Sequence, residues 1–439
     1  MSVGDNQPSR TGERAILIGV EWKRGRGPRN PSIPAAEEPL AELRELALSA
    51  GAEVVDQVFQ SREAPEAATL IGAGKVRELA ALAASTHADV VLFDHDLSPT
   101  QQRNLEDELG IKVLDRTQLI LDIFARRART REGRLQVELA QLEYLLPRLT
   151  GHGAAMSRLG GGIGTRGPGE TKLETDRRRI ARRIKSLEHE LEGVRVTRTV
   201  HRRQRRAVPL TTLALVGYTN AGKSTLFNRL TNAGVTADAR MFATLDPTVR
   251  GLVLPSRRRV LVSDTVGFIR RLPTTLVKAF RATLEEVREA GLILHIVDSS
   301  SPHAAEHMAR VVQVLGEIGA GSIPQLLVWN KLDRLAGTEA SRVVGRLAEH
   351  AADPAETPAV AISALTGEGI GTLLRKVDEV LPFDPVSRVQ FRFPIQEGAS
   401  ISLVHQFGRV LSIHYSGNCC EIDAEVPQSL QRRLAAYLS

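Results

Sequence analysis

Apolar runs of strand length alternate with amphipathic stretches in the first third of the chain. RAILIGVEW and ADVVLFDHD are nearly continuous apolar runs, whereas PLAELRELALSA and KVRELAALAAS carry apolar residues at helical spacing. This alternation predicts a small α/β domain with a largely parallel sheet over residues 14–130. The preceding residues 1–13 lack such a pattern, and we expect them to be disordered.

Two apolar seams follow, both with the 4-3-4-3 spacing of helices that pack against each other. The first consists of Leu135, Leu139, Leu142, Leu146 and Leu149, and the second of Ile180, Ile184, Leu187, Leu191 and Val194. Between the seams lies LGGGIGTRGPGETKLETDRRRI, which begins with glycines and ends in arginines. The pattern predicts an antiparallel helical hairpin over residues 131–208, with a glycine-rich basic loop (151–171) at its tip.

Strand-length apolar runs return in residues 209–382 and again in residues 383–439. The last segment predicts a small α/β unit, in which SISLVHQF and RVLSIHYSGNCCEIDAEV alternate like strands and QSLQRRLAAYL forms a closing helix. We therefore expect two further domains after the hairpin.

A phosphate-binding loop lies near the start of residues 209–382. The residues Gly217-Tyr-Thr-Asn-Ala-Gly222-Lys223-Ser224 fill every position of the P-loop pattern between an apolar strand and a helix. In such a loop, backbone N–H groups bind phosphate oxygens, the lysine neutralises charge on the β- and γ-phosphates, and the hydroxyl ligates Mg²⁺. The pattern predicts these roles for Lys223 and Ser224.

Further boxes follow strand-like runs in the order expected for a nucleotide-binding sheet. Asp264-Thr-Val-Gly267 is placed to hold the water shell of the metal and to contact the γ-phosphate. Thr244 in MFATLDPT is placed to offer Mg²⁺ a second hydroxyl. In Asn330-Lys-Leu-Asp333, the Asp333 carboxylate can accept two hydrogen bonds from guanine N1 and N2, which adenine cannot donate. Ser363-Ala-Leu365 is expected to support the base. The nucleotide predicted is therefore GTP.

Composition narrows the choice of partner and compartment. Lys and Arg total 58 against 51 Asp and Glu, a formal net charge of +7 that favours a polyanionic partner. Cys419 and Cys420 are adjacent, which excludes a disulfide framework and a cysteine zinc site and favours the reducing cytoplasm. No stretch reaches the length of a membrane span, and the N-terminus lacks the apolar core of a signal peptide.

Four of these stretches together resemble a known family. GYTNAGKST, FATLDPT, DTVGFIR and RGPGETKLETDRR are similar to motifs of the HflX family, within the Obg-HflX superfamily of translation-factor-class GTPases. One departure is Lys172, where we would expect glutamine. The resemblance covers nearly the whole chain. It implies an α/β fold in which a P-loop GTPase domain is joined by a small N-terminal α/β domain, a helical hairpin and a small C-terminal α/β domain.

The same resemblance implies a function. HflX-like proteins are expected to bind the large ribosomal subunit, with the hairpin loop inserted towards the peptidyl-transferase region, and to split or rescue stalled ribosomes under stress. The expected partners are GTP or GDP and the RNA and proteins of that subunit. We expect a monomer.

The candidate site residues fall into three groups. For catalysis we expect Lys223, Thr244, Asp264 and Gly267. For the metal we expect Ser224 and Thr244. For the nucleotide we expect Gly217, Tyr218, Thr219, Asn220, Ala221, Gly222, Lys223, Ser224, Thr225, Phe242, Ala243, Thr244, Leu245, Asp246, Asp264, Thr265, Val266, Gly267, Asn330, Lys331, Leu332, Asp333, Ser363, Ala364 and Leu365.

Two positions leave alternatives open. Many GTPases orient the attacking water with a glutamine after D-x-x-G, whereas Phe268 has no polar atom there, which predicts slow intrinsic hydrolysis. Core packing alone would also explain Phe268, and both can be true. In some related GTPases an asparagine at the place of Asn220 helps to hold K⁺, and the alternative is that it only braces the loop.

Other hypotheses are weaker. Asp94, His95 and Asp96 end a strand-like run where open α/β sheets bind ligands, but a solvated loop is the simpler expectation. His303 and His307 have helical i, i+4 spacing without a third metal ligand nearby in sequence. A signalling GTPase that dimerises through the heptads would leave the glycine loop and its arginines unexplained. Residues 14–112 contain no complete nucleotide site that could support a separate RNA-remodelling activity.

Overall fold

The structure is a computed structural model of the chain. It describes residues 12–22, 38–149, 168–206, 210–231, 241–242, 248–270, 286–335, 337, 357–381 and 384–439, with side chains from residue 40 in the first helix and over 174–194 in the long helix. The α/β fold class predicted from the sequence is confirmed. Within the described residues, no helix is both long enough and apolar enough to cross a bilayer.

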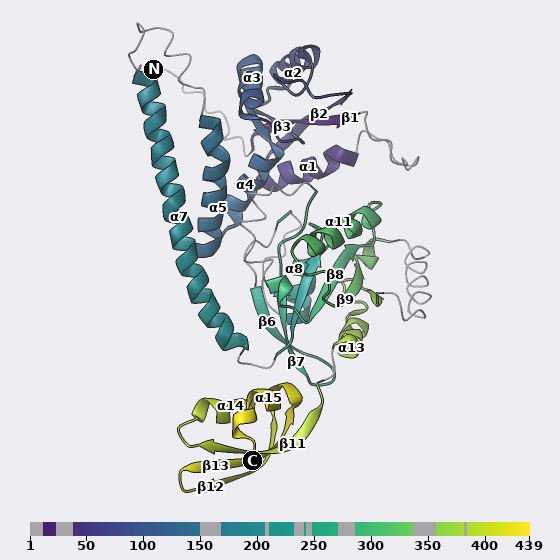
Figure 1. Cartoon of the computed structure of the whole chain (residues 1–439). Coiled ribbons are helices and arrows are strands. Elements are labelled where there is room, and N and C mark those ends of the chain that lie inside the picture. The colour runs from purple at the N-terminus through teal and green to yellow at the C-terminus, as the bar shows by residue number, and fades with distance from the viewer. Residues whose placement is uncertain are drawn as a thin grey trace, which may run out of the picture.

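The N-terminal unit is a parallel sheet covered by helices on both faces (Figure 1). Its strands, in the order β2-β1-β3-β4, are β1 (Arg14–Trp22), β2 (Glu53–Arg62), β3 (Val90–Phe93) and β4 (Lys112–Asp115). Its helices are α1 (Glu38–Ala50), α2 (Ala73–Thr86), α3 (Pro99–Leu109) and α4 (Arg116–Arg127). Successive residues of a strand point to opposite faces, so Ile16 and Leu17 enter different cores. The near-continuous apolar run of β1 follows from this double coverage.

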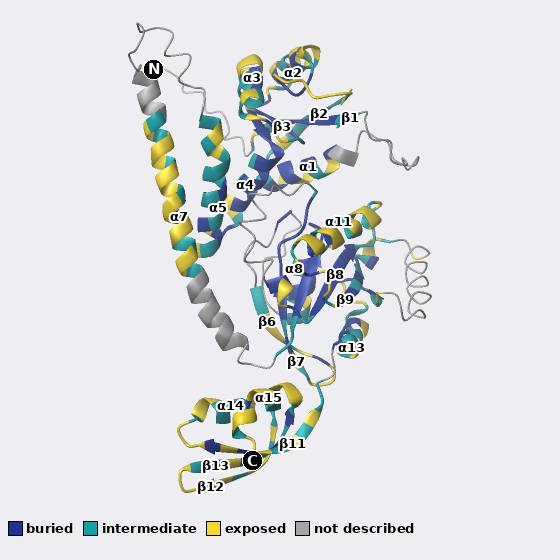
Figure 2. Ribbon diagram, in the orientation of Figure 1, coloured by how far each residue is buried: buried dark blue, intermediate teal, exposed yellow. Residues whose placement is uncertain are grey.

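Next come α5 (Arg131–Leu145), the 3₁₀ turn η1 (Leu146–Leu149) and the long helix α7 (Pro168–Arg206). Arg131 pairs with Glu190, and Glu138 pairs with Arg183, so α5 and α7 run antiparallel. In α7, the seam positions are buried or half-buried while most of their neighbours are exposed. Figure 2 shows that much of the described part of this helix is exposed. α7 begins three residues before the expected end of the loop, and residues 150–167 lie outside the described residues.

The central sheet has the order β10-β9-β8-β5-β7-β6 and is parallel except for β6. Its strands are β5 (Thr212–Gly217), β6 (Thr248–Val253), β7 (Arg259–Asp264), β8 (Leu292–Asp298), β9 (Gln325–Asn330) and β10 (Ala359–Ala361). The associated helical segments are α8 (Lys223–Thr231), α11 (Ala304–Glu317), η2 (Leu332–Arg334) and α13 (Ile370–Val380). Because β5, β7, β8 and β9 are parallel, their carboxyl ends meet at one edge of the sheet, where α/β proteins bind ligands.

The C-terminal unit is an antiparallel sheet in the order β11-β13-β12, with helices on one face. It consists of β11 (Val386–Pro394), α14 (Gly398–Phe407), β12 (Arg409–Ser416), β13 (Cys419–Pro427), α15 (Gln428–Arg433) and η3 (Ala435–Tyr437). The strand predicted for SISLVHQF was wrong, because these residues form most of α14. Ile401, Val404 and Phe407 also have helical spacing, and Val404 is fully buried against the sheet.

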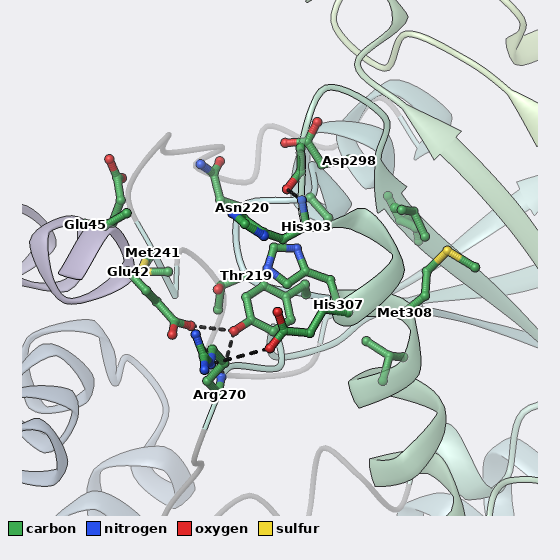
Figure 3. Close-up of a pocket in the computed structure, with 18 of the residues that line it drawn as sticks. Glu42, Glu45, Thr219, Asn220, Met241, Arg270, Asp298, His303, His307 and Met308 are labelled. Carbon is green, nitrogen blue, oxygen red and sulfur yellow. Dashed lines mark hydrogen bonds and ion pairs between the residues drawn. The ribbon is translucent and has the colours of Figure 1, made fainter. Parts of the chain in front are cut away.

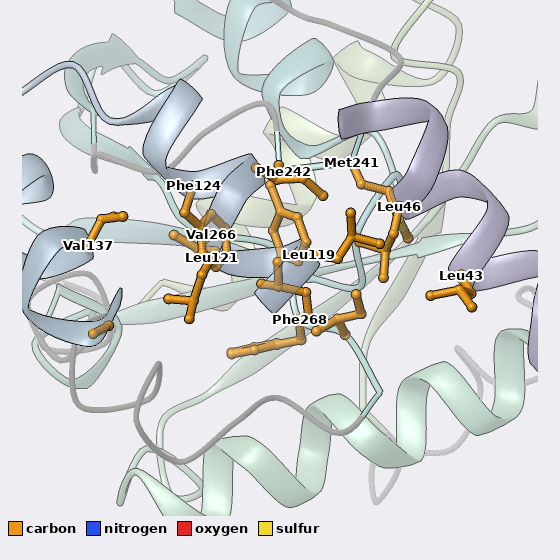
Figure 4. Close-up of a cluster of buried hydrophobic side chains, with 14 of the residues drawn as sticks. Leu43, Leu46, Leu119, Leu121, Phe124, Val137, Met241, Phe242, Val266 and Phe268 are labelled. Carbon is orange, nitrogen blue, oxygen red and sulfur yellow. The ribbon is translucent and has the colours of Figure 1, made fainter. Parts of the chain in front are cut away.

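The N-terminal unit and the central domain share one apolar core. Leu43 and Leu46 of α1 and Phe124 of α4 belong to the same buried cluster as Phe242 and Phe268 of the central domain (Figure 4). The rings of Phe124 and Phe242 meet edge to face, with centroids 4.6 Å apart. The helices of the first unit therefore pack directly behind the nucleotide-binding edge of the second.

Candidate nucleotide-binding site

The phosphate loop connects β5 to α8, and its glycines are required by close approaches. A Cβ on Gly217 would collide with the carbonyl oxygen of Ile296 on the neighbouring strand β8. Gly222 has a φ of +95°, and a Cβ there would collide with the Asn330 side chain. Asn220 also has a positive φ, of 61°, which asparagine tolerates better than most residues. The motif is therefore fixed by backbone geometry.

Lys223 and Asp264 form the charged centre of the site. The Lys223 ammonium is buried and donates to the carbonyl oxygens of Gly217, at 3.1 Å, and Tyr218, at 2.8 Å. Burial lowers the pKa of Lys223 to about 8, although the charge of Asp264 acts in the opposite direction. The Ser224 hydroxyl donates to Asp264 Oδ2 at 2.8 Å. A hydroxyl beside a carboxylate is an oxygen donor set that suits Mg²⁺.

The segment after β7 is hydrogen-bonded to the phosphate loop. The Phe268 N–H donates to Gly217 O at 3.1 Å, and the Thr219 N–H donates to Phe268 O at 2.7 Å. A Cβ on Gly267 would lie 2.9 Å from both Lys223 Nζ and Thr219 Cα, so only glycine fits between them. Asp264-Thr-Val-Gly267 is thereby held directly beside the lysine of the phosphate loop.

The base-side boxes meet at the ends of β9 and β10. Asn330 Nδ2 donates to Ala221 O at 2.8 Å, and the Ala364 N–H donates to Asn330 Oδ1 at 2.9 Å, so one amide connects the phosphate loop to the last box. Ser363 Oγ donates to Asp333 Oδ1 at 2.5 Å. The Lys331 ammonium lies 2.7 Å from Asp298. Asp333 is exposed and held in place by the serine.

The structure thus brings most of the expected site residues to one edge of the sheet. They are Gly217 to Thr225, Asp264 to Gly267, Asn330 to Asp333, and Ser363 to Leu365. Phe242 is described, but its side chain lies in the core shared with the N-terminal unit. Ala243, Thr244, Leu245 and Asp246 lie outside the described residues, so their predicted roles stay predictions.

Comparisons with known proteins agree with this geometry. Three family profiles match the chain in succession: GTP-binding GTPase N-terminal over residues 37–125, GTP-binding GTPase Middle Region over 127–205, and 50S ribosome-binding GTPase over 212–331. GTPase HflX of Caldanaerobacter subterraneus subsp. tengcongensis is 44% identical, covering 99% of this chain and 96% of the relative. The chain belongs to the HflX family of GTPases. GTPase HflX of Escherichia coli is 45% identical, covering 90% and 89%. That of Alkalihalophilus pseudofirmus is 58% identical, covering 73% and 74%.

Membership of the HflX family shows that the chain is a GTP-binding protein and a GTP hydrolase, as the motifs predicted. The family resemblance stated on GYTNAGKST and the neighbouring stretches is confirmed over almost the whole length. The site of this HflX-family chain nevertheless contains groups that no motif predicted, and they come from the N-terminal unit.

A cavity of about 220 Å³ separates the outer side of the phosphate loop from α1 and α11 (Figure 3). Glu42 and Glu45 of α1, Tyr218, His295 of β8 and His307 of α11 are among its lining residues. The Tyr218 ring stacks on His307 with centroids 3.9 Å apart. Among the described residues, no three His, Cys, Asp or Glu side chains are grouped to hold a metal. The contribution of α1 was missed because nothing in its helical pattern distinguishes Glu42 from a solvent-facing residue.

Asp94 was also predicted incorrectly, because it does not lie in a solvated loop. It is buried, and its Oδ1 accepts a hydrogen bond from Arg116 Nη1 at 2.7 Å. Asp96 accepts from the Thr117 hydroxyl at 2.5 Å. The polar end of β3 therefore supports the first residues of α4.

Proposed function

We propose that this chain is a ribosome-associated GTPase that binds the large subunit and splits or rescues stalled ribosomes under stress. The carrying observation is the match of residues 212–331 to the family described as 50S ribosome-binding GTPase, in a chain that also carries an exposed basic helix. The division of labour follows the expected segments: residues 209–382 bind and hydrolyse GTP, and residues 131–208 approach the ribosome. A monomer working in the cytoplasm, where ribosomes act, is part of the proposal.

We assign the chemistry to the residues gathered at the sheet edge. Lys223 and the N–H groups of the phosphate loop bind the β- and γ-phosphates, and the Gly267 N–H binds the γ-phosphate. Ser224 and Thr244 would hold Mg²⁺, with Asp264 ordering its water shell, and the ion would neutralise charge that develops during phosphoryl transfer. Asn330 and Asp333 bind guanine, and Ser363 to Leu365 support them. The contacts of Asn330 and Ser363 favour this assignment.

Hydrolysis by the free protein is expected to be slow. Phe268 has no polar atom to orient water, and its side chain is 3% exposed within the shared core. A ribosomal component would then supply the missing water positioning or charge. Asn220 offers a second route, since a K⁺ ion held beside the phosphates would act as an arginine finger does in other GTPases.

The first half of α7 would provide the contact with RNA. Arg177, Arg178, Arg179, Arg182 and Lys185 are all exposed. Arg178 also contacts Glu174, and Arg183 contacts Glu138. Each phosphate neutralised by such side chains releases counterions, so binding to ribosomal RNA should fall steeply as salt rises. The glycines expected at the tip of the hairpin would permit close approach to irregular RNA without clashes.

The test is GTP turnover by the full chain, with and without large ribosomal subunits, in potassium and in sodium buffer. We expect slow turnover alone, a marked rise with subunits, and cosedimentation that declines with salt. A variant lacking residues 160–169 should bind GTP normally but fail to be stimulated or to dissociate ribosomes. Normal splitting by this deletion variant, or equal rates with and without subunits, would end the proposal. Equal rates in the two buffers would remove only the K⁺ role.

The rival hypothesis was a signalling GTPase that dimerises through its heptads. The seam of α7 packs against α5 of the same chain, and Leu187 within it is fully buried. Because the seam is already used internally, the structure favours the hairpin that contacts RNA over a coiled-coil dimer.

A further inference from the structure

Glu42 of the N-terminal unit contacts two segments of the GTPase site at once. The Tyr218 hydroxyl, from the second position of the phosphate loop, donates to Glu42 Oε1 at 2.6 Å. The same hydroxyl accepts from the backbone N–H of Arg270 at 2.8 Å, and that N–H also lies 3.3 Å from Glu42 Oε1. Figure 3 shows Glu42 and Arg270 lying close together, with dashed lines marking these interactions. Arg270 follows Gly267 by three residues, so it fixes the exit of the D-x-x-G segment.

Arg116 holds the other side of this contact. Its Nη2 lies 2.7 Å from Glu42 Oε2 and donates to the carbonyl oxygen of Arg270 at 3.1 Å, while Nη1 pairs with Asp94. The Arg116 side chain is 3% exposed, and those of Glu42 and Asp94 are 12% and 10% exposed. Burial alone would lower the pKa of Arg116, but the two carboxylates outweigh it and raise that pKa. The backbone of Arg270 is therefore held at both its N–H and its C=O by groups that a charged pair keeps in place.

The phosphate loop and the D-x-x-G segment are joined at two levels. Close to Lys223, the Phe268 backbone bonds to Gly217 and Thr219. At the exit of the segment, the Tyr218 side chain joins the loop to Arg270, and both depend on Glu42. Only a triphosphate needs both elements in register, because a diphosphate does not reach the glycine of D-x-x-G.

We propose that Glu42, held by Arg116, is a positioning residue of the GTPase site although it belongs to another structural unit. It sets the register between the phosphate loop and Gly267, and so favours GTP over GDP. This inference rests on the roles proposed above for Lys223 and Gly267. It does not depend on ribosome binding.

The experiment compares affinities of the full-length protein for a non-hydrolysable GTP analogue and for GDP, without ribosomes. Glu42→Gln removes the charge that accepts from Tyr218 and pairs with Arg116. We expect it to lower affinity for the analogue about fivefold to tenfold while GDP affinity changes about twofold or less. Tyr218→Phe removes the hydroxyl with little change in packing and should produce the same selective loss. The Glu42→Gln, Tyr218→Phe double variant should bind the GTP analogue no more weakly than either single variant, because both substitutions act through the same contact.

Glu45→Gln is the matched control. Glu45 lies on the same helix and lines the same cavity, but it is exposed, and its carboxylate accepts no hydrogen bond from the described residues. It should leave the ratio of the two affinities unchanged. If Glu42 had only a structural role, its substitution would lower the affinities for the GTP analogue and for GDP equally. That outcome, or an unchanged ratio of the two affinities in Glu42→Gln and Tyr218→Phe, would overturn the proposal. Absence of any stimulation of wild-type GTP turnover by large ribosomal subunits would instead contradict the proposed function.

Discussion

His295 is an uncommon residue for the middle of a buried sheet. It lies on β8 between β5 and β9, its side chain is 3% exposed, and its Nε2 has no hydrogen-bond partner among the described residues. Burial, with a smaller effect of the Lys223 charge, lowers the pKa of His295 to about 4. The imidazole is therefore neutral at pH 7. Its protonation at lower pH should destabilise the central domain.

The expected pH dependence follows from that shift. In the unfolded chain the pKa of histidine is about 6.5, so the unfolded state binds the proton first as pH falls. The contribution of His295 to stability is complete above about pH 6.5 and declines towards pH 4, by about 3 kcal/mol in total. In His295→Leu, the denaturant midpoint should decline less between pH 7 and pH 4.5 than in the wild type. Unfolding can be measured by the fluorescence of Trp329 on the adjacent strand β9. Identical pH profiles for the wild type and the variant would contradict the shift.

Sequence and structure differ most in what they reveal about single residues. Gly217, Gly222 and Asn330 could be named from the sequence, because local backbone geometry and phosphate chemistry require those residue types at fixed spacing. Glu42, Arg116 and His295 could not, because their importance comes from residues distant in the sequence. Tyr218 lies 176 residues from Glu42, and Arg270 lies 154 residues from Arg116. No spacing rule connects α1 to the phosphate loop. Only the packing of two units on each other makes a helix-surface glutamate part of a nucleotide site.

At the scale of elements, periodicity predicted the seam of the hairpin but could not rank its contacts. Leu187 is the seam residue of α7 that is fully buried, whereas the side chains of the ion pair between Arg183 and Glu138 are 44% and 41% exposed. Apolar burial should therefore stabilise the hairpin more than its ion pairs do. The same periodicity failed for α14, because its few apolar residues fit both strand and helix spacing.

Two substitutions separate these contributions. Leu187→Ala should lower the free energy of unfolding by about 3 kcal/mol, since it removes transfer free energy and leaves a cavity. Glu138→Gln, which removes the charge facing Arg183, should leave the free energy of unfolding nearly unchanged. Any small effect should disappear at high salt, which screens the pair. Hydrogen exchange over residues 174–194 measures both effects in the helix concerned. A larger effect from Glu138→Gln than from Leu187→Ala would show that charge, and not the seam, joins α5 to α7.

At the scale of the molecule, the continuous core between the N-terminal unit and the central domain determines how the chain responds to damage. Composition and periodicity separated these units because each has its own sheet. They could not show that Phe124, Phe242 and Phe268 belong to one cluster, since an apolar residue on a helix looks the same whether it faces its own sheet or a neighbouring domain. Shared burial implies that the two sheets lose their structure together. The C-terminal unit has a separate core and should not follow them.

Phe124→Ala tests this coupling. Phe124 is fully buried, and its removal should cost about 3 to 5 kcal/mol. The protein contains two tryptophans, Trp22 on β1 and Trp329 on β9, so variants that retain one of them report on each sheet separately. With a shared core, Phe124→Ala should lower both denaturant midpoints by similar amounts, although Trp329 belongs to a different sheet. Phe393→Ala, in the core of the C-terminal unit, is the control and should move neither midpoint. A shift confined to Trp22 would mean that the two cores unfold independently, and Glu42 would then connect units that are not otherwise coupled.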